Sequence, residues 1–144
     1  MKTKYLIFIL TIILSGCELI EIGTKKPKLV DISQHSALGA IMLFKTELDS
    51  QNVFGASRLF ASPDGSFFIA EEKFALYDDI ARLGRIIGTK PITAVIADSN
   101  ITLNPQIISV KIDYLKKISF TTCKINDTWY IIAYSEQYNT DFQQ

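Results

Sequence analysis

The hydrophobic period changes near Pro91, and this change constrains the fold more than any other feature of the chain. Before it, apolar residues recur at the three- and four-residue spacing of amphipathic helices. After it, apolar and polar residues alternate, as they do in half-buried strands. Helices followed by a run of strands indicate an α+β domain, with the helices packed on an antiparallel sheet. We place this domain at residues 33–135.

Three helices are expected before the change of period. The first begins near Ser33 or Ser36, either of which can cap it, and carries an apolar stripe of Ala37, Ile41, Phe44 and Leu48. A short second helix is expected at 53–60, followed by a turn at 62–65. The third, at 71–87, ends at Gly88. Its expected buried face consists of Phe74, Tyr77, Ile80, Ala81, Gly84 and Ile87.

Strands are expected from residue 92 onward. The segments with strand character are 92–98, 101–103, 108–114, 118–125 and 129–135. A hairpin connection is expected at 126–128, and Trp129 is expected to be buried where the last strand packs on the helices. The tail at 136–144 is polar and is expected to fray.

The first 17 residues resemble the export signal of bacterial lipoproteins. Lys2 and Lys4 precede an apolar run at 5–14, which has the length of a signal-peptide core and is too short to span a bilayer. The sequence Leu-Ser-Gly-Cys at 14–17 then resembles a lipobox. The resemblance implies that residues 1–16 are removed and that Cys17 becomes the lipid-bearing first residue of the mature protein.

A lipidated cysteine implies a protein held in the cell envelope. Several acyl chains on Cys17 give stable membrane anchoring, which a single chain does not. Residues 17–32 then form the lipidated cysteine and a polar tether. Position 18 is Glu rather than the Asp that favours inner-membrane retention in enterobacterial lipoproteins, so Glu18 favours the outer membrane, on its periplasmic side or at the surface.

Composition excludes several classes of partner and site. The whole chain carries 15 basic and 15 acidic side chains, and removal of Lys2 and Lys4 leaves 13 against 15. This slightly acidic balance argues against nucleic acid. With lipid on Cys17, Cys123 has no second cysteine to pair with. No metal-ligand spacing and no cofactor motif occurs, so we expect neither a metal nor a cofactor.

The mature domain resembles the NTF2-like, or cystatin-like, superfamily over residues 33–135. The resemblance rests on the segment 124–132, which reads as a strand, an Asx-rich turn, a tryptophan and an alternating strand, and on the first helix with Ala37, Phe44 and Leu48. It implies helices packed in a cone-shaped sheet, often with a pocket at its open end. Catalytic members place Asp, His or Tyr in that pocket, but His35 lies outside the strands here.

Candidate pocket residues follow from this expectation, each with core packing or a solvated surface as the alternative. They are Tyr77, Asp113, Tyr114, Phe120 and Trp129. Asp113 is the candidate general base, because it is expected in an alternating strand. His35, the adjacent pair Asp78 and Asp79, and the free Cys123 form no catalytic constellation, so no catalytic residue is assigned.

Three function classes remain open. The first is a non-enzymatic, lipid-anchored envelope protein that binds a protein partner or a small apolar ligand. The second is an NTF2-like isomerase or dehydratase that uses a pocket carboxylate. The third is a structural accessory subunit of an envelope complex. Two or more titratable groups converging in an apolar pocket would favour the enzyme.

Overall fold

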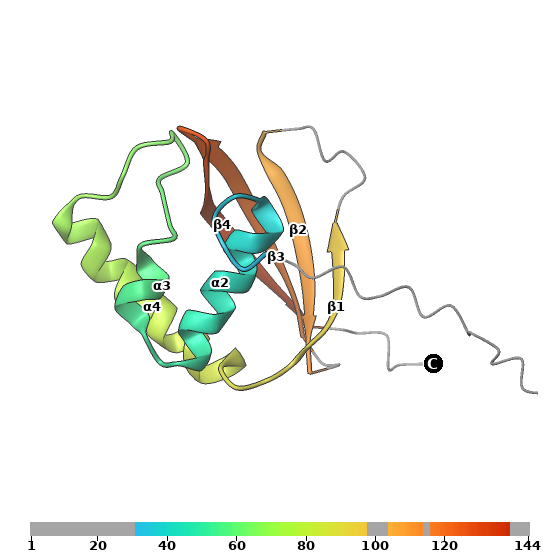
Figure 1. The fold of residues 1–144 in the computed structure, drawn as a ribbon. Coiled ribbons are helices and arrows are strands. Elements are labelled where there is room, and N and C mark those ends of the chain that lie inside the picture. Colours follow the sequence, from blue (N-terminus) through green and yellow to red (C-terminus); the bar gives the residue numbers. More distant parts are fainter. Residues whose placement is uncertain (1–30, 98–103, 114–115, 139–144) are drawn as a thin grey trace, which may run out of the picture.

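Helices and strands follow one another in the expected order. The computed structural model describes residues 31–97, 104–113 and 116–138. Its described elements are α2 (Ala37–Asp49), α3 (Val53–Ser57), α4 (Ala70–Ile87), β1 (Ile92–Ala97), β2 (Gln106–Ile112), β3 (Lys116–Ile125) and β4 (Thr128–Tyr138). Figure 1 shows the helices on one side of an open antiparallel sheet with the order β1-β2-β3-β4, which confirms the α+β class.

Helix α2 forms the layer between the sheet and the other helices. It contacts β2, β3 and β4, while α3 and α4 pack against it. The Ser36 hydroxyl caps the helix by accepting the Gly39 N–H at 3.0 Å. The predicted stripe of Ala37, Ile41, Phe44 and Leu48 is buried, as the sequence period required.

Helix α4 has the predicted extent, but its first turns are not buried. Ile80, Leu83 and Ile87 lie in the core, whereas residues 70–75 are exposed, and Phe74 is 71% exposed. The prediction that Phe74 is buried was wrong, because the helix extends beyond the layer on which it packs. Gly88 ends the helix with an ordinary φ of −55°, and Thr89 takes the left-handed φ of 64°.

The sheet buries one face of its three C-terminal strands. Ile108, Val110 and Ile112 of β2 pair with Phe120, Ile118 and Lys116 of β3, which places the apolar members on the helix side. The Phe44 ring meets Phe60 and Phe120 edge-on, with centroid distances of 5.3 and 5.9 Å. This aromatic contact ties α2 to β3.

The predicted hairpin connection is present in sharper form, and a second turn lies where a strand was expected. Asn126 and Asp127 both have positive φ and join Ile125 to Thr128 as a two-residue hairpin. Strand β2 ends at Ile112, and Asp113 follows in a turn with φ 48°. The expectation that Asp113 lies within a strand was therefore wrong. Strand β4 continues to Tyr138, past the predicted end at Ser135, and Trp129 is half-buried rather than buried.

The predicted helix at 53–60 ends at Ser57, because the chain beyond it pairs with the sheet. Phe60 forms a parallel bridge with Ile131 of β4. The Ile131 N–H donates to the Leu59 carbonyl at 2.8 Å, and the Ala61 N–H donates to the Ile131 carbonyl at 3.0 Å. These two bonds fix Phe60 beside the start of β4.

Candidate functional site

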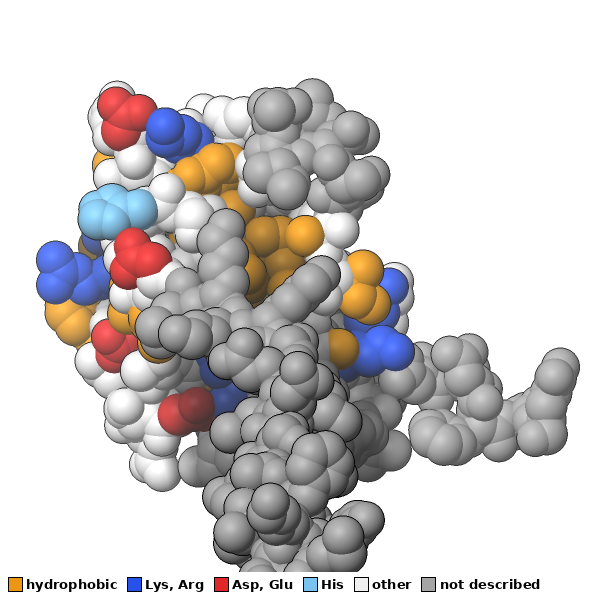
Figure 2. All heavy atoms as spheres, turned by 45° about the vertical axis from the view of Figure 1, so that its right-hand side comes forward, with side chains coloured by type: hydrophobic (Ala, Val, Ile, Leu, Met, Phe, Trp, Pro, Cys, Tyr) orange, Lys and Arg blue, Asp and Glu red, His pale blue; other side chains and the backbone are white. Residues whose placement is uncertain are grey.

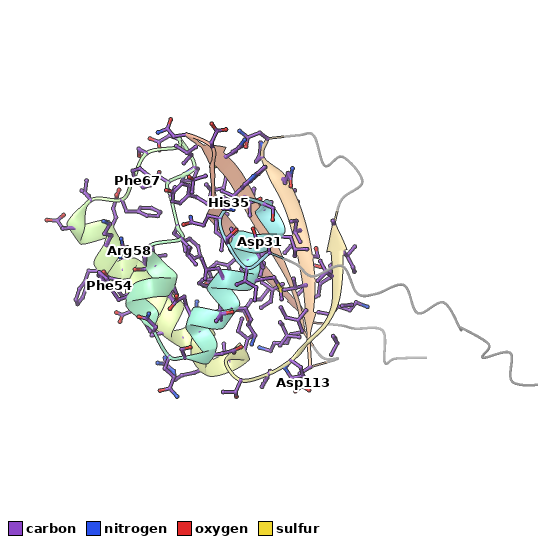
Figure 3. The ribbon with its side chains drawn as sticks, viewed as in Figure 1. Asp31, His35, Phe54, Arg58, Phe67 and Asp113 are labelled. Atoms are coloured by element: carbon purple, nitrogen blue, oxygen red, sulfur yellow. The ribbon has the colours of Figure 1, made fainter. Side chains whose placement is uncertain are left out.

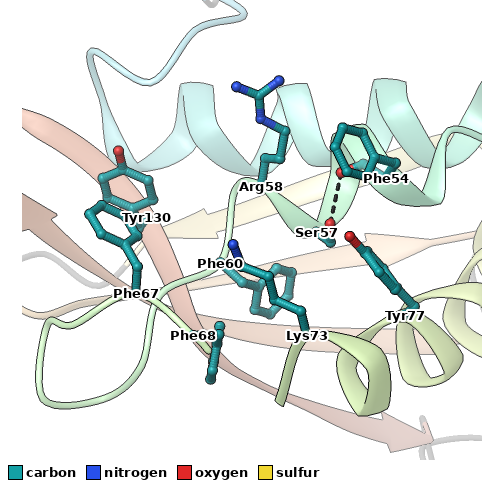
Figure 4. Close-up of a pocket in the computed structure, with 9 residues that line it drawn as sticks. All are labelled: Phe54, Ser57, Arg58, Phe60, Phe67, Phe68, Lys73, Tyr77 and Tyr130. Carbon is teal, nitrogen blue, oxygen red and sulfur yellow. Dashed lines mark hydrogen bonds between the residues drawn. The ribbon is translucent and has the colours of Figure 1, made fainter. Parts of the chain in front are cut away.

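An aromatic cleft lies where the segment around Phe60 meets α3, the first half of α4 and β4. Its volume is about 550 Å³, within the range of about 300–1,000 Å³ usual for small-molecule sites. Six aromatic rings and three polar side chains line it (Figure 4): Phe54, Ser57, Arg58, Phe60, Phe67, Phe68, Lys73, Tyr77 and Tyr130. We call this site the aromatic cleft.

The floor of the aromatic cleft is continuous with the hydrophobic core. Phe60 is only 5% exposed, and its ring contacts Phe44 from α2. Its position is fixed by the bridge to Ile131, which also brings the neighbouring Tyr130 to the cleft. The floor is therefore apolar and packed against the core.

A tight turn brings two further phenylalanines back over this floor. The Ser62 N–H donates to the Ser66 carbonyl at 2.8 Å, and Gly65 has a φ of 83°, which a glycine adopts without strain. Phe67 then leaves the turn and meets the Tyr130 ring at a centroid distance of 5.3 Å. Phe67 remains 56% exposed, so it forms part of the rim.

Helices α3 and α4 form the opposite wall. The Ser57 hydroxyl donates to the Phe54 carbonyl at 2.7 Å, so it is already engaged within α3. The rings of Phe54 and Tyr77 lie 6.4 Å apart. Phe54 is 61% exposed and forms the rim on this side.

Two charged side chains of the described residues line the aromatic cleft, and both are basic. The Arg58 guanidinium lies 5.9 Å from the centroid of the Phe54 ring, and Figure 4 shows the Lys73 amine extending toward Phe60. Neither side chain forms an ion pair with any described residue. No described residue lining the cleft carries a carboxylate. The site thus combines an apolar interior with positive charge.

The structure separates the residues that the sequence suggested for a pocket. Tyr77 lines the aromatic cleft, whereas Phe120 is 2% exposed within the core and Trp129 packs against the core's edge. Tyr114 and the lipidation candidate Cys17 lie outside the described residues. Asp113 donates its backbone N–H to the Pro91 carbonyl at 3.1 Å, and Figure 3 shows it at the other end of the molecule from Phe67 and Arg58.

The remaining chemical candidates also lie apart. His35 is exposed, and its Nδ1 lies 3.3 Å from a carboxylate oxygen of Asp31. Asp78 and Asp79 are exposed on α4, and Asp79 lies 3.4 Å from Arg82. Cys123 is half-buried, and burial raises the pKa of its thiol, which keeps it in the less reactive protonated form.

Sequence reasoning missed most of the aromatic cleft. Phe67 and Phe68 were visible as a short apolar segment after a turn, and Phe54 lay in a predicted helix. Arg58 and Lys73 gave no signal, because isolated basic residues are common on surfaces. What joins these residues is the pairing of Phe60 with β4, a contact between distant parts of the chain that no local pattern encodes.

No protein-family model matches the chain, and no curated protein and no solved structure matches it. Within the described residues, no helix has the length and apolar character to cross a bilayer. The same part of the chain contains no group of three or more His, Cys, Asp or Glu side chains placed to hold a metal ion.

Proposed function

We propose that this protein is a lipid-anchored lipoprotein of the cell envelope whose domain binds a small apolar ligand in the aromatic cleft. The observation that carries the ligand-binding part is the cleft itself, about 550 Å³ lined by six aromatic rings. Clefts of this size with mainly apolar walls and a few polar groups are typical ligand sites. The aromatic rim at Phe54 and Phe67 is exposed and therefore accessible to a ligand.

The lipid anchor is proposed from the order of sequence features at the N-terminus. Two lysines, an apolar run and Leu-Ser-Gly-Cys at 14–17 occur in the order that a lipoprotein signal requires. Cys17 would carry the lipid, and Glu18 favours the outer membrane. An anchored domain would meet hydrophobic molecules of the envelope at high local concentration.

The resemblance to the NTF2-like superfamily belongs to the same proposal. Helix α2 lies across one face of an antiparallel sheet, and a cleft opens where the helices meet β4. The enzyme alternative lacks such support, because the candidate base Asp113 lies away from the cleft (Figure 3) and the lining side chains include no carboxylate. No described feature favours the accessory-subunit alternative over ligand binding.

Energy transfer from Trp129 tests ligand binding in the full chain. Trp129 is the only tryptophan and adjoins Tyr130 of the cleft, so transfer to a bound polyene reports occupancy. The protein would be held in phosphatidylcholine nanodiscs and titrated with cis-parinaric acid methyl ester, an uncharged probe. We expect saturable transfer.

Two matched variants locate the binding site. Phe67→Asp should weaken binding about tenfold or more, because burying a phenylalanine contributes about 1.5–3 kcal/mol. Phe74→Asp, a similar change at an exposed residue outside the cleft lining, should leave binding unchanged. Absence of saturable transfer, or equal effects of the two variants, would contradict the proposed site.

Metabolic labelling with a radioactive fatty acid tests the anchor. The wild-type protein should incorporate the label and fractionate with membranes, and Cys17→Ser should abolish both. Cys123→Ser is the matched control and should label normally, because its thiol lies in the folded domain. Labelling that survives Cys17→Ser would overturn the anchor proposal without affecting the ligand proposal.

A further inference from the structure

We infer that the ligand of the aromatic cleft is an anionic amphiphile, a single acyl chain that ends in a carboxylate or phosphate. This inference rests on the proposed function and specifies the chemistry of its ligand. The apolar walls would accept the chain, and two basic side chains, Arg58 and Lys73, would pair with the head group.

The placement of charge in the aromatic cleft carries the first step. Arg58 follows the end of α3, and Lys73 lies near the start of α4, so the two basic groups come from different helices of the same wall. Figure 4 shows the Lys73 amine directed across the cleft toward Phe60. The same figure shows the Arg58 guanidinium directed away from Lys73, on the Phe54 side of the cleft, so one anion contacts both groups only if the long Arg58 side chain turns inward.

The second step is that no acid among the described residues neutralises these charges, and the one further contact is that of the Arg58 guanidinium with the Phe54 ring. Within the described residues, neither Arg58 nor Lys73 forms an ion pair, although five pairs occur elsewhere. The nearby acid Glu72 is already engaged, because its carboxylate accepts the Ile69 N–H at 3.0 Å. Both basic groups therefore remain available to an anion, and charge-assisted hydrogen bonds are the stronger kind.

The third step is the shape of the apolar surface. Phe60 and Phe68 lie toward the core side, and Phe54 and Phe67 form the exposed rim. A flexible chain can follow such a surface, and a water-soluble anion without a chain would leave the rings unused. Apolar walls with positive charge at the mouth fit a molecule with one apolar and one negative end.

A comparison of cis-parinaric acid with its methyl ester tests the charge requirement directly. Both probes have the same polyene chain, and at pH 8 only the acid is negatively charged. With the full chain in phosphatidylcholine nanodiscs, we expect the acid to bind about tenfold more tightly than the ester. Equal affinities would overturn the anionic ligand while leaving the proposed apolar site intact, and failure of both probes would overturn the proposed function itself.

Variants that remove charge test whether Arg58 and Lys73 cause the preference for the acid over the ester. Arg58→Gln combined with Lys73→Gln should reduce the preference for the acid to less than about twofold, while binding of the ester persists and shows that the cleft is still folded. Arg85→Gln combined with Lys124→Gln removes the same charges at exposed residues outside the cleft and should keep the preference. A preference that survives the first pair of changes would overturn the roles of Arg58 and Lys73.

Competition distinguishes the possible sources of the anion. Palmitate and a monoacyl glycerophosphate would each be tested for displacement of bound cis-parinaric acid. Displacement by either supports the proposal, and their relative potency identifies carboxylate or phosphate as the preferred head group. Displacement by vesicles of anionic phospholipid, but by neither monomeric amphiphile, would instead make the rim a membrane contact and overturn the proposal.

Discussion

Gly39 lies where the N-terminal segment crosses the first turn of α2, so a side chain there would meet backbone. A Cβ atom would lie 2.3 Å from the Ser33 carbonyl oxygen. Gly39→Ala should therefore lower the free energy of unfolding by about 1–3 kcal/mol, as overpacking does, although alanine is the better helix former. Urea denaturation of the full chain measures this loss.

Gly84→Ala is the matched control for this prediction. A Cβ at Gly84, also within a helix, meets only a Leu48 methyl at 3.5 Å, an ordinary contact. This variant should be neutral or more stable by up to about 1 kcal/mol, since alanine is favoured over glycine in helix interiors. Similar shifts in the two variants would mean that residues 31–33 do not pack on α2 as described.

The raised pKa of Tyr134 predicts that the protein loses stability at alkaline pH. Burial chiefly, then the negative charge of Asp79, raises the pKa of its phenol. A raised pKa means that the folded state disfavours the phenolate. The contribution of the neutral Tyr134 phenol to the free energy of unfolding is therefore complete below the unfolded pKa of about 10, and it is lost as pH rises through the folded pKa. Tyr134→Phe keeps the ring beside Phe60 and should lose less stability between neutral and strongly alkaline pH. Parallel curves of unfolding free energy against pH for the two proteins would contradict this.

At the scale of elements, the Asp49 carboxylate joins the end of α2 to the link between α4 and β1. The amine of Lys45, whose side chain is 9% exposed, contacts the Asp49 carboxylate one helical turn later. The same Asp49 oxygen accepts the Thr89 N–H at 2.7 Å, where the chain has a positive φ. Asp49 therefore satisfies both a nearly buried charge and a strained turn.

Removing the Asp49 carboxylate should lower the free energy of unfolding more than removing the Lys45 charge that it neutralises. Asp49→Ala leaves Lys45 unpaired, so we expect a loss of about 2–3 kcal/mol, below the cost for a fully buried pair because the Asp49 side chain is 40% exposed. Lys45→Met keeps the apolar stem without the charge and should change stability by less than about 1 kcal/mol. Thermal and urea denaturation measure the stability of both variants. A larger loss for Lys45→Met than for Asp49→Ala would show that Asp49 does not hold the end of α2 as described.

Hydrophobic period was sufficient to predict the helices and most strands, but not where each one meets its neighbours. Ile80 and Ile87 were correctly placed on the buried face of α4, because a helical stripe records which residues share a face. Phe74 belongs to the same stripe and is exposed, because the stripe does not record how far the underlying layer extends. Asp113 was misplaced for a related reason, since strand alternation does not mark the residue at which pairing stops. The aromatic cleft depends on such junctions, and of the predicted site residues that the structure describes only Tyr77 lines it.

At the scale of the whole molecule, the sheet ends in an apolar edge strand. Val95 and Ile96 of β1 are 41% and 47% exposed, and Ile107 of the neighbouring β2 is 52% exposed. Figure 2, in which this side of the molecule comes forward, shows hydrophobic side chains near the centre of the face. The sequence of β1, Ile-Thr-Ala-Val-Ile-Ala, contains no charged residue that would oppose pairing with another chain.

A charge placed on this edge should slow aggregation at little cost in stability. Ile96→Lys changes an exposed side chain, so the free energy of unfolding should shift by no more than about 0.5 kcal/mol. Light scattering during incubation near the melting temperature should rise more slowly than for wild type. Thr46→Lys adds the same charge on the exposed side of α2 and should have a smaller effect. If both variants slow the rise of light scattering equally, the cause is the net charge of the protein rather than the edge strand.

The bridge between Phe60 and Ile131 also sets the order in which the molecule can be completed during synthesis. Each strand of the β1-β2-β3-β4 sheet pairs with the next one to be made, so the sheet can grow one hairpin at a time. Phe60, by contrast, emerges early and must wait for β4, the last strand of the described chain. A nascent chain that stops short of residue 128 would leave the Phe60 ring without its strand and the cleft without its Tyr130 wall, which would expose that ring to chaperones and proteases.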